Sequence, residues 1–191
     1  MMTPVLITPP AAEPLTLAEA KLWLRLDTPD EDDAVNRLIA AARLTVEAES
    51  GLKLIDQAWR LVMDQQPADN CIRVPLKPFK AVTAARDFAL DNTQSVVSSA
   101  AYAVDAQSLP GRIILNAAFP APGRAYAGIE FDLSIGHGAA AANVPAPLRQ
   151  AMLLLIAHWF ENRGDSGAGA ETRGVPPEIA LLLSNYRRWR L

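Results

Sequence analysis

The sequence predicts an α+β fold: a helical core of about four helices with a small antiparallel β-rich insertion between the second helix and the central helix. Two segments near the N-terminus carry helix-start signals and apolar stripes of helical spacing, and a long apolar segment follows at 147–163. Between them, apolar residues recur at every second position, as they do in strands. With 191 residues, 50% of them hydrophobic, the chain is long enough to bury such a core.

Residues 1–14 contain four prolines and are expected to form an N-terminal arm, either disordered or laid on a neighbour. The rest of the chain, 15–191, is expected to form one domain. Thr16 and Glu19 stand at the spacing of a capping box, in which each side chain accepts a backbone N–H of the other residue. This box predicts a first helix over 16–26.

A second helix is predicted over 29–50. Thr28 and Glu31 repeat the capping-box spacing, with a proline at the first helical position, where its fixed φ fits. Gly51 follows the apolar stripe and supplies the left-handed conformation that ends many helices. Residues 30–33 are all acidic and lie at the positive end of the helix dipole. A helix start therefore explains this run better than a metal site does.

Residues 54–137 are predicted to form the β-rich insertion. The segment 129–135 alternates apolar and polar residues and is its clearest strand. Segments 101–105 and 112–115 flank a turn that contains proline and glycine. Residues 80–90 fit a strand but are also weakly helical. Short strands separated by turns indicate a small antiparallel sheet or sandwich.

The segment 147–163 is predicted to be the central helix. Apolar residues cover nearly all of its circumference, which is typical of a buried helix, and the run is too short to span a bilayer. A linker precedes it at 138–147, and Gly164 is expected to end it. A segment with the composition of a mobile loop follows at 164–175, and a last helix is predicted over 177–189.

Composition and charge exclude several classes of function. The net charge of −3 argues against sequence-independent DNA binding, which needs clustered Lys and Arg. A single cysteine, Cys71, excludes an internal disulfide and a Cys-rich metal site. No secretion signal opens the chain, so secretion is not expected, and no glycine-rich loop has the spacing of a phosphate-binding motif.

Candidate catalytic or metal-binding side chains are few. His158 and Glu161 stand three residues apart and could start a metal site, but such sites need three or four ligands; a packing or hydrogen-bonding histidine is favoured. His137 lies between two glycines and could be catalytic, but no nucleophile motif accompanies it, and a turn residue is favoured. Cys71 is interpreted as a small core residue. No catalytic residue, metal or cofactor is therefore predicted.

The C-terminal residues combine aromatic and cationic side chains. One interpretation is a solvated helix end, where the dipole favours cations. The other is a partner-binding tail, since Tyr, Trp and Arg are the commonest interface anchors. The residue types alone do not decide between these two interpretations. The residues concerned are Tyr186, Arg187, Arg188, Trp189, Arg190 and Leu191.

Several short blocks belong together in their order and spacing. They are LTLAEAK (15–21), LRLD (24–27), LIAAAR (38–43), GL (51–52), QAW (57–59), RVPL (73–76) with Pro78, PGRI (110–113), GHG (136–138), VPAPLRQA (144–151) and HWFENR (158–163). By these blocks the chain resembles the head–tail connector (adaptor) proteins of long-tailed double-stranded DNA phages, a family with versions in prophages and gene transfer agents.

The resemblance implies a structural protein of a virion or virion-like particle, assembled in the bacterial cytoplasm. It implies a ring, commonly twelve-fold, that docks beneath the portal, extends the DNA channel and provides the platform for the next neck or tail protein. The implied partners are the portal protein, that neck or tail protein and further copies of the chain; DNA passes through without sequence-specific binding, and no membrane is involved. The tail at 186–191 is expected to bind the portal.

Two alternatives stay open. The chain could be another neck component, such as a stopper or tail terminator, but those are typically smaller and β-dominated. It could also be a small enzyme that uses His137 or His158. The helix-start signals and the apolar central helix argue for the connector.

Overall fold

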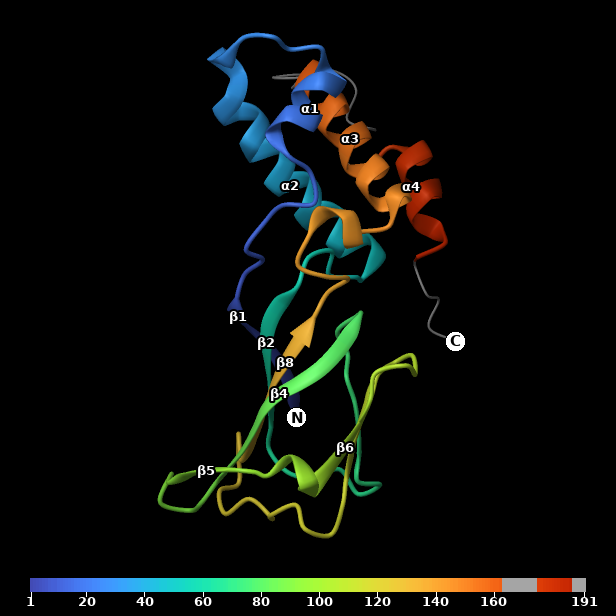
Figure 1. Cartoon of the computed structure of the whole chain (residues 1–191). Coiled ribbons are helices and arrows are strands. Elements are labelled where there is room, and N and C mark those ends of the chain that lie inside the picture. The colour runs from blue at the N-terminus through green and yellow to red at the C-terminus, as the bar shows by residue number, and fades with distance from the viewer. Residues whose placement is uncertain (163–174, 187–191) are drawn as a thin grey trace. The chain divides into compact units, whose positions relative to one another are not determined.

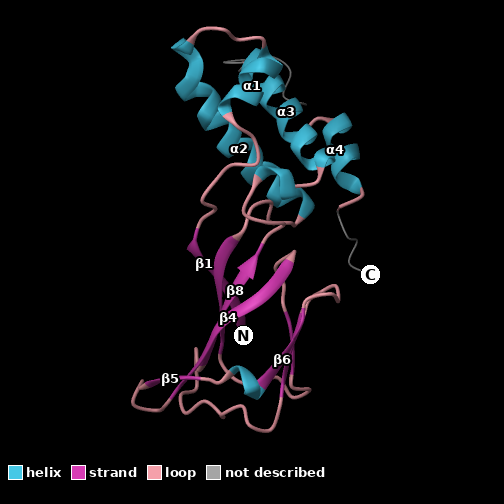
Figure 2. Ribbon diagram, viewed as in Figure 1, coloured by secondary structure: helices cyan, strands magenta, loops and turns pink. Residues whose placement is uncertain are grey.

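A computed structural model describes residues 1–162 and 175–186 of the chain (Figure 1). These residues form two compact units. Figure 2 shows the strands, which belong to the first unit, and helices α1 to α4, which belong to the second. The chain passes between the units three times, so each is built from segments that are distant in the sequence. The strand unit contains 1–11 and 56–137, and the helical unit contains 12–55 and the described residues from 138 onward.

The helical unit is organised around α3. Leu148, Met152 and Leu155 of this helix are at most 1% exposed, and α3 contacts α1, α2 and α4. Trp159 near its C-terminal end is partly buried against the same core. The elements of the unit are α1 (Leu17–Leu24), the 3-10 turn η1 (Pro29–Glu31), α2 (Asp32–Ser50), the 3-10 turn η3 (Ala141–Asn143), α3 (Ala146–Glu161) and α4 (Pro177–Ser184).

The boundary signals of α1 and α2 are mostly present. The Thr16 side chain accepts the Glu19 N–H at 3.1 Å, and the Glu19 carboxylate accepts the Thr16 N–H at 2.8 Å, so the first capping box is confirmed. α1 ends two residues earlier than predicted because Arg25 takes a left-handed conformation with φ 58°. Gly51 ends α2 in a left-handed conformation with φ 70°, as predicted.

The second predicted capping box, Thr28 with Glu31, is wrong, because the Thr28 side chain makes no cap hydrogen bond. Pro29–Glu31 instead form the 3-10 turn η1, and α2 begins at Asp32. Lys21 of α1 donates to the Thr28 carbonyl at 2.8 Å and pairs with Asp32 at 2.5 Å. A lysine from the preceding helix therefore holds the entry to α2, which the local sequence does not reveal.

The strand unit is a sandwich of two antiparallel sheets, with strand orders β1-β2-β8-β4-β5 and β3-β7-β6. Side chains of both sheets share one core, in which the Phe131 ring lies 5.8 Å from Tyr102 and 5.7 Å from Phe119 between centroids. Together with the four helices, these sheets confirm the α+β class. The strands are β1 (Met2–Thr8), β2 (Gln57–Met63), β3 (Cys71–Arg73), β4 (Phe79–Phe88), β5 (Gln94–Val96), β6 (Tyr102–Asp105), β7 (Arg112–Leu115) and β8 (Ile129–Ile135).

β8 is the central strand of the larger sheet and lies between β2 and β4. Its apolar residues are buried as predicted, but its polar residues are half-buried. Asp132 pairs with Arg60 of β2 and Arg86 of β4, each at 2.7 Å, and Arg60 lies 3.4 Å from Glu130. Burial alone would raise the pKa of Asp132, but the hydrogen bonds from Arg60 and Arg86 outweigh it and lower the pKa. Ion pairs therefore tie the three central strands together.

Most of the predicted N-terminal arm belongs to the fold. Met2–Thr8 is the edge strand β1, paired antiparallel with β2 of the same chain, and the Met1 amino group pairs with Asp64 at 2.8 Å. The expectation of a disordered or neighbour-bound arm rested on its prolines. Pro4, however, stands on an edge strand, where a missing N–H is tolerated.

The segment that fitted either a strand or a helix, 80–90, is strand up to residue 88, as part of β4. β6 pairs with β7, as segments that flank a turn should. Gly164, the rest of the predicted loop to 174, and residues 187–189 of the last predicted helix lie outside the described residues.

We expect Leu155→Ala to lower the free energy of unfolding by about 2–5 kcal/mol, because this 1%-exposed side chain leaves a cavity in the helical core. Leu44→Ala, on the solvent side of α2 at 58% exposure, is the matched control and should change it by less than about 0.5 kcal/mol. Urea unfolding followed by helical circular dichroism measures both. Equal losses in the two variants would contradict a buried α3.

Candidate assembly surfaces

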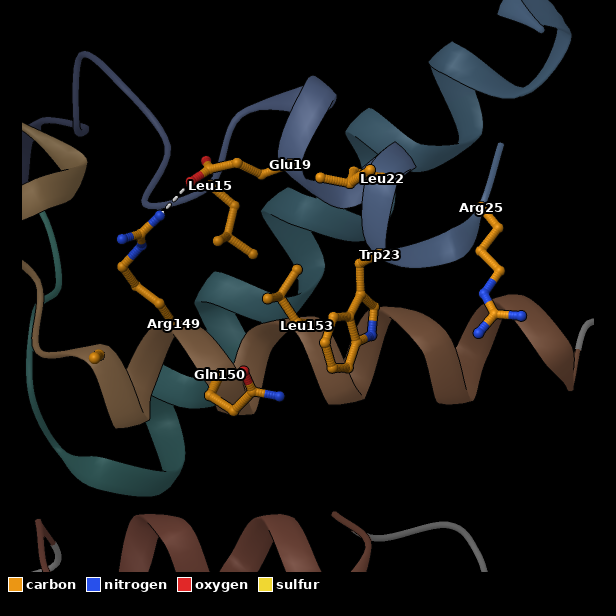
Figure 3. Close-up of a pocket in the computed structure, with 9 residues that line it drawn as sticks. Leu15, Glu19, Leu22, Trp23, Arg25, Arg149, Gln150 and Leu153 are labelled. Atoms are coloured by element: carbon orange, nitrogen blue, oxygen red, sulfur yellow. Dashed lines mark hydrogen bonds and ion pairs between the residues drawn. The ribbon is translucent and has the colours of Figure 1, made fainter. Parts of the chain in front are cut away.

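Two of the sequence blocks that carry the resemblance, 15–21 and 144–151, meet in the helical unit. They line an open groove of about 660 Å³ between α1 and α3 (Figure 3). The groove is mainly apolar at its centre and charged at its ends. Its lining residues are Leu15, Glu19, Leu22, Trp23, Arg25, Ala146, Arg149, Gln150 and Leu153.

One end of the groove is closed by an ion pair between Glu19 of α1 and Arg149 of α3, drawn as a dashed line in Figure 3. Arg149 also donates to the Pro14 carbonyl at 3.1 Å. The hydrogen bond from the Thr16 N–H, and then the Arg149 charge, lower the pKa of Glu19 against the opposing effect of burial. The capping carboxylate therefore has two functions, since it starts α1 and joins it to α3.

The rim of the groove presents apolar side chains to solvent. Leu22 is 82% exposed and Trp23 is 44% exposed. In Figure 3 the Trp23 side chain extends from α1 toward α3 and lies beside Leu153. Arg25, at the opposite end from Arg149, makes no ion pair with any residue in the described part of the chain. Exposed apolar side chains gathered around a concave surface mark protein-binding sites, and tryptophan is among the residues that most often anchor such contacts.

A second exposed apolar position lies on α4. Ile179 and Leu183 of α4 are buried in the helical core, whereas Leu181 is 71% exposed. Glu178, three residues before Leu181, is also exposed. Residues three apart lie on the same side of a helix, so α4 has an inner apolar face and an outer face that combines a leucine with a carboxylate.

His137 follows β8 and is half-buried. Its ring Nε2 is buried and has no hydrogen-bond partner among the described residues, and neither does Oδ1 of Asp56. Burial lowers the pKa of His137, although the Asp56 charge opposes the shift. Asp56 is itself paired with Lys80 at 2.7 Å. The imidazole is thus held neutral at physiological pH, and it occupies the strand end that the sequence indicated.

The other candidates for chemistry are separated in the fold. His158 is half-buried in the last turn of α3, where its carbonyl accepts from Asn162, while Glu161 is exposed. Cys71 is half-buried on β3. Within the described residues, no three His, Cys, Asp or Glu side chains gather as metal ligands would. The acidic residues 30–33 span η1 and the first turn of α2.

The C-terminal candidates are only partly described. Tyr186 packs, half-buried, against the helical core, and its N–H donates to the Leu183 carbonyl at 3.0 Å. Arg187, Arg188, Trp189, Arg190 and Leu191 lie outside the described residues. Among described residues, no helix is both long enough and apolar enough to cross a membrane.

Sequence reasoning missed the groove and the ion-pair cluster around Asp132. The cluster had a partial signal, because carboxylates alternate with apolar residues on β8 and single arginines stand on β2 and β4, but which charges face each other depends on strand order. The groove had none, since Leu22 belongs to an ordinary apolar stripe in the sequence. Surfaces of this kind can bind other proteins.

Comparisons with known proteins identify relatives. A family model described as head completion protein matches residues 13–189, across both units. No curated protein matches the chain. Similar chains in solved structures are matched over 100% of this chain and 97% of their own length.

These structures are of gene transfer agent particles. One is the neck of an empty particle computed with C6 symmetry, at 28% identity and a TM-score of 0.79. Another is the virion of a native particle, at 28% identity and 0.77. A third is the neck of a native particle computed with C12 symmetry, at 26% identity and 0.74.

We expect the His137 ring to titrate below pH 6.5, its ordinary value, because burial penalises the charged form. The unfolded chain then binds this proton more readily, so the stability from His137 is complete above pH 6.5 and is lost as the pH falls through the lower folded pKa. Proton NMR of the histidine ring measures the midpoint, and His137→Gln assigns the signal. A midpoint at or above 6.5 would refute the burial argument.

Proposed function

Because the chain belongs to the head completion protein family, we propose that it is a structural protein of the neck that joins head and tail in a phage or gene-transfer-agent particle. The observation that carries the proposal is the extent of the likeness. The family match and the similar neck chains both extend over the helical unit and the strand unit together. A likeness confined to the fold of one unit would be much weaker support for the proposed function.

Within the neck, the chain acts as the adaptor. Copies form a ring beneath the portal, extend the DNA channel and carry the next neck protein. The C6 and C12 symmetries used for the similar necks support a ring, because cyclic symmetry places identical copies around an axis. The mildly acidic net charge of −3 suits a channel along which DNA slides, since a basic lining would hold the phosphates.

The adaptor role is distinguished from that of a stopper or tail terminator by the architecture of the chain. Those components are typically smaller and β-dominated. Here four helices form a core of their own, with α3 in contact with α1, α2 and α4. The helical unit favours the adaptor.

The proposal includes no enzymatic role. His137 is half-buried near Asp56, and His158 lies at the end of α3, in the other unit. Each therefore has a structural setting that accounts for it. Catalysis by either ring would need a nucleophile or a metal brought to it, and the fold assigns the two histidines to different units.

The segment 187–191 binds the portal in this proposal. Its three arginines and one tryptophan are side chains that commonly anchor interfaces. Tyr186 packs against its own helical core, so we place the start of the binding segment after it.

Deleting the gene from a host that makes such particles should leave DNA-filled heads without attached tails, because the platform between them is missing. Electron microscopy and an infection or DNA-transfer assay measure the loss. Wild-type gene on a plasmid should restore attachment. Particles with normal tails in the deletion strain would overturn the proposed function.

The same strain tests the enzymatic alternative. Complementation by the double variant His137→Gln, His158→Gln should restore tails as the wild type does, because neither ring performs chemistry. If this variant folds and enters particles but fails to restore tails, the result would support the enzymatic alternative.

Truncation after Tyr186 should weaken portal binding by at least tenfold, because it removes the arginines and tryptophan while leaving the core contact of Tyr186 in place. Pull-down or calorimetric titration with purified portal measures it. The matched control, Arg37→Ala on the exposed side of α2, should bind the portal as the wild type does. Undiminished binding by the truncated chain would exclude the tail from the portal contact.

A further inference from the structure

We propose that the groove between α1 and α3 receives the outer face of α4 of the next copy in the ring. In this contact Leu181 of one copy enters the groove beside Leu22 of its neighbour, and Glu178 pairs with Arg25. The inference rests on the proposed ring, and it names the surfaces through which the helical units of adjacent copies meet.

The two surfaces differ from each other and lie on different sides of one helix. α1 and α4 each contact α3, and Figure 3 shows α1 on one side of α3 and α4 on the opposite side. Closed rings need such heterologous contacts, in which one patch of a copy meets a different patch of the next. A groove that met its own copy would instead bring Arg25 against Arg25.

The apolar parts of the two surfaces complement each other. Leu22 at 82% and Leu181 at 71% are among the most exposed large apolar side chains in the described helices. The groove has room for a leucine, at about 660 Å³, and Trp23 and Leu153 supply an apolar wall. Burying both leucines removes from water the apolar surface that the isolated helical unit leaves exposed.

The charges fix the direction in which the helices meet. Arg25 follows Leu22 by three residues, whereas Glu178 precedes Leu181 by three. Leu22 and Arg25 line the same groove, with Arg25 just past the C-terminal end of α1, and Glu178 and Leu181 lie on one side of α4. Only an antiparallel alignment of α1 with the neighbouring α4 therefore brings leucine to leucine and arginine to glutamate. This alignment also puts the cation at a helix C-terminus against an anion in a first turn, which the helix dipoles favour.

Neither charge is used elsewhere in the described part of the chain. Glu19 and Arg149 at the other end of the groove pair with each other, and Lys21 pairs with Asp32. Arg25 and Glu178 make no such pair with a described residue. The contact therefore breaks no ion pair within the copy.

Cysteine cross-linking in assembled particles tests the contact. The variant Leu22→Cys, Leu181→Cys, with Cys71→Ser to remove the natural thiol, should give a ladder of linked copies on a non-reducing gel after mild oxidation. Leu22→Cys alone and Leu181→Cys alone should give no linked copies, and a mixture of the two single variants should give dimers only. The matched control, Leu44→Cys with Leu181→Cys, should not link, because Leu44 is exposed on α2 but outside the groove.

Each other outcome overturns the proposal. Dimers from Leu22→Cys alone would show that the groove meets itself, and a link from position 22 to a different neck protein would assign the groove to that partner. If particles contain the variant but no copies are linked, the ring can still exist, but the contact between the groove and α4 is refuted. Wild-type chain that never enters particles would instead defeat the proposed function.

A charge exchange tests the contact without cysteines, and it decides the matter if the cysteine variants fail to fold. Arg25→Glu and Glu178→Arg should each lower the yield of particles with attached necks by roughly fivefold, since each puts like charges together. The double variant should recover most of the loss, because the pair is restored in reverse. Single variants without effect, or a double variant as poor as the singles, would refute the pairing.

Discussion

Burial of α3 is the constraint on which the helical unit depends. Leu148, Met152, Leu155 and Ile156 are at most 1% exposed, and the surfaces that cover them come from α1, α2 and α4. These helices are drawn from both sides of the strand unit in the sequence, so the unit can form only when the two ends of the chain come together around α3. A helix that is apolar on most sides would otherwise expose several leucines to water.

The strand unit has its own core and its own fixed centre. Phe131 lies between aromatic rings of two different segments, and Asp132 on the opposite face of the same strand pairs with arginines on both neighbouring strands. β8 is therefore fixed on both faces. Because each unit has a separate core, surface variation in one can occur without disturbing the packing of the other, which suits a protein that contacts several partners.

The proposed role follows from surfaces and not from a reactive site. The exposed leucines of α1 and α4 leave apolar surface in contact with water, and the proposed contact with a neighbouring copy would cover it. The salt bridges that close one end of the groove and hold the entry to α2 keep α1, and with it the groove, in a defined position. A preformed surface loses less conformational entropy when it binds than a mobile one does.

The sequence by itself determined the elements whose causes are local. The capping box of Thr16 and Glu19, the left-handed Gly51, the alternation in β8 and the apolar α3 were all readable, because each depends on residues within one or two turns. The family resemblance could also be read from the order of short blocks.

Only the tertiary structure decided the features that join distant segments. Three features depend on contacts across the fold that no local pattern encodes: the pairing of β1 with β2, the hydrogen bond from Lys21 to the Thr28 carbonyl at the entry to α2, and the ion pair of Glu19 with Arg149. The same holds for exposure: Leu22 and Leu155 are both leucines in apolar stripes, and only the packing of α1 on α3 leaves one at 82% exposure and the other at 1%. Local chemistry fixes which segments are helices and strands, whereas the surfaces available for assembly depend on which of their faces remain uncovered.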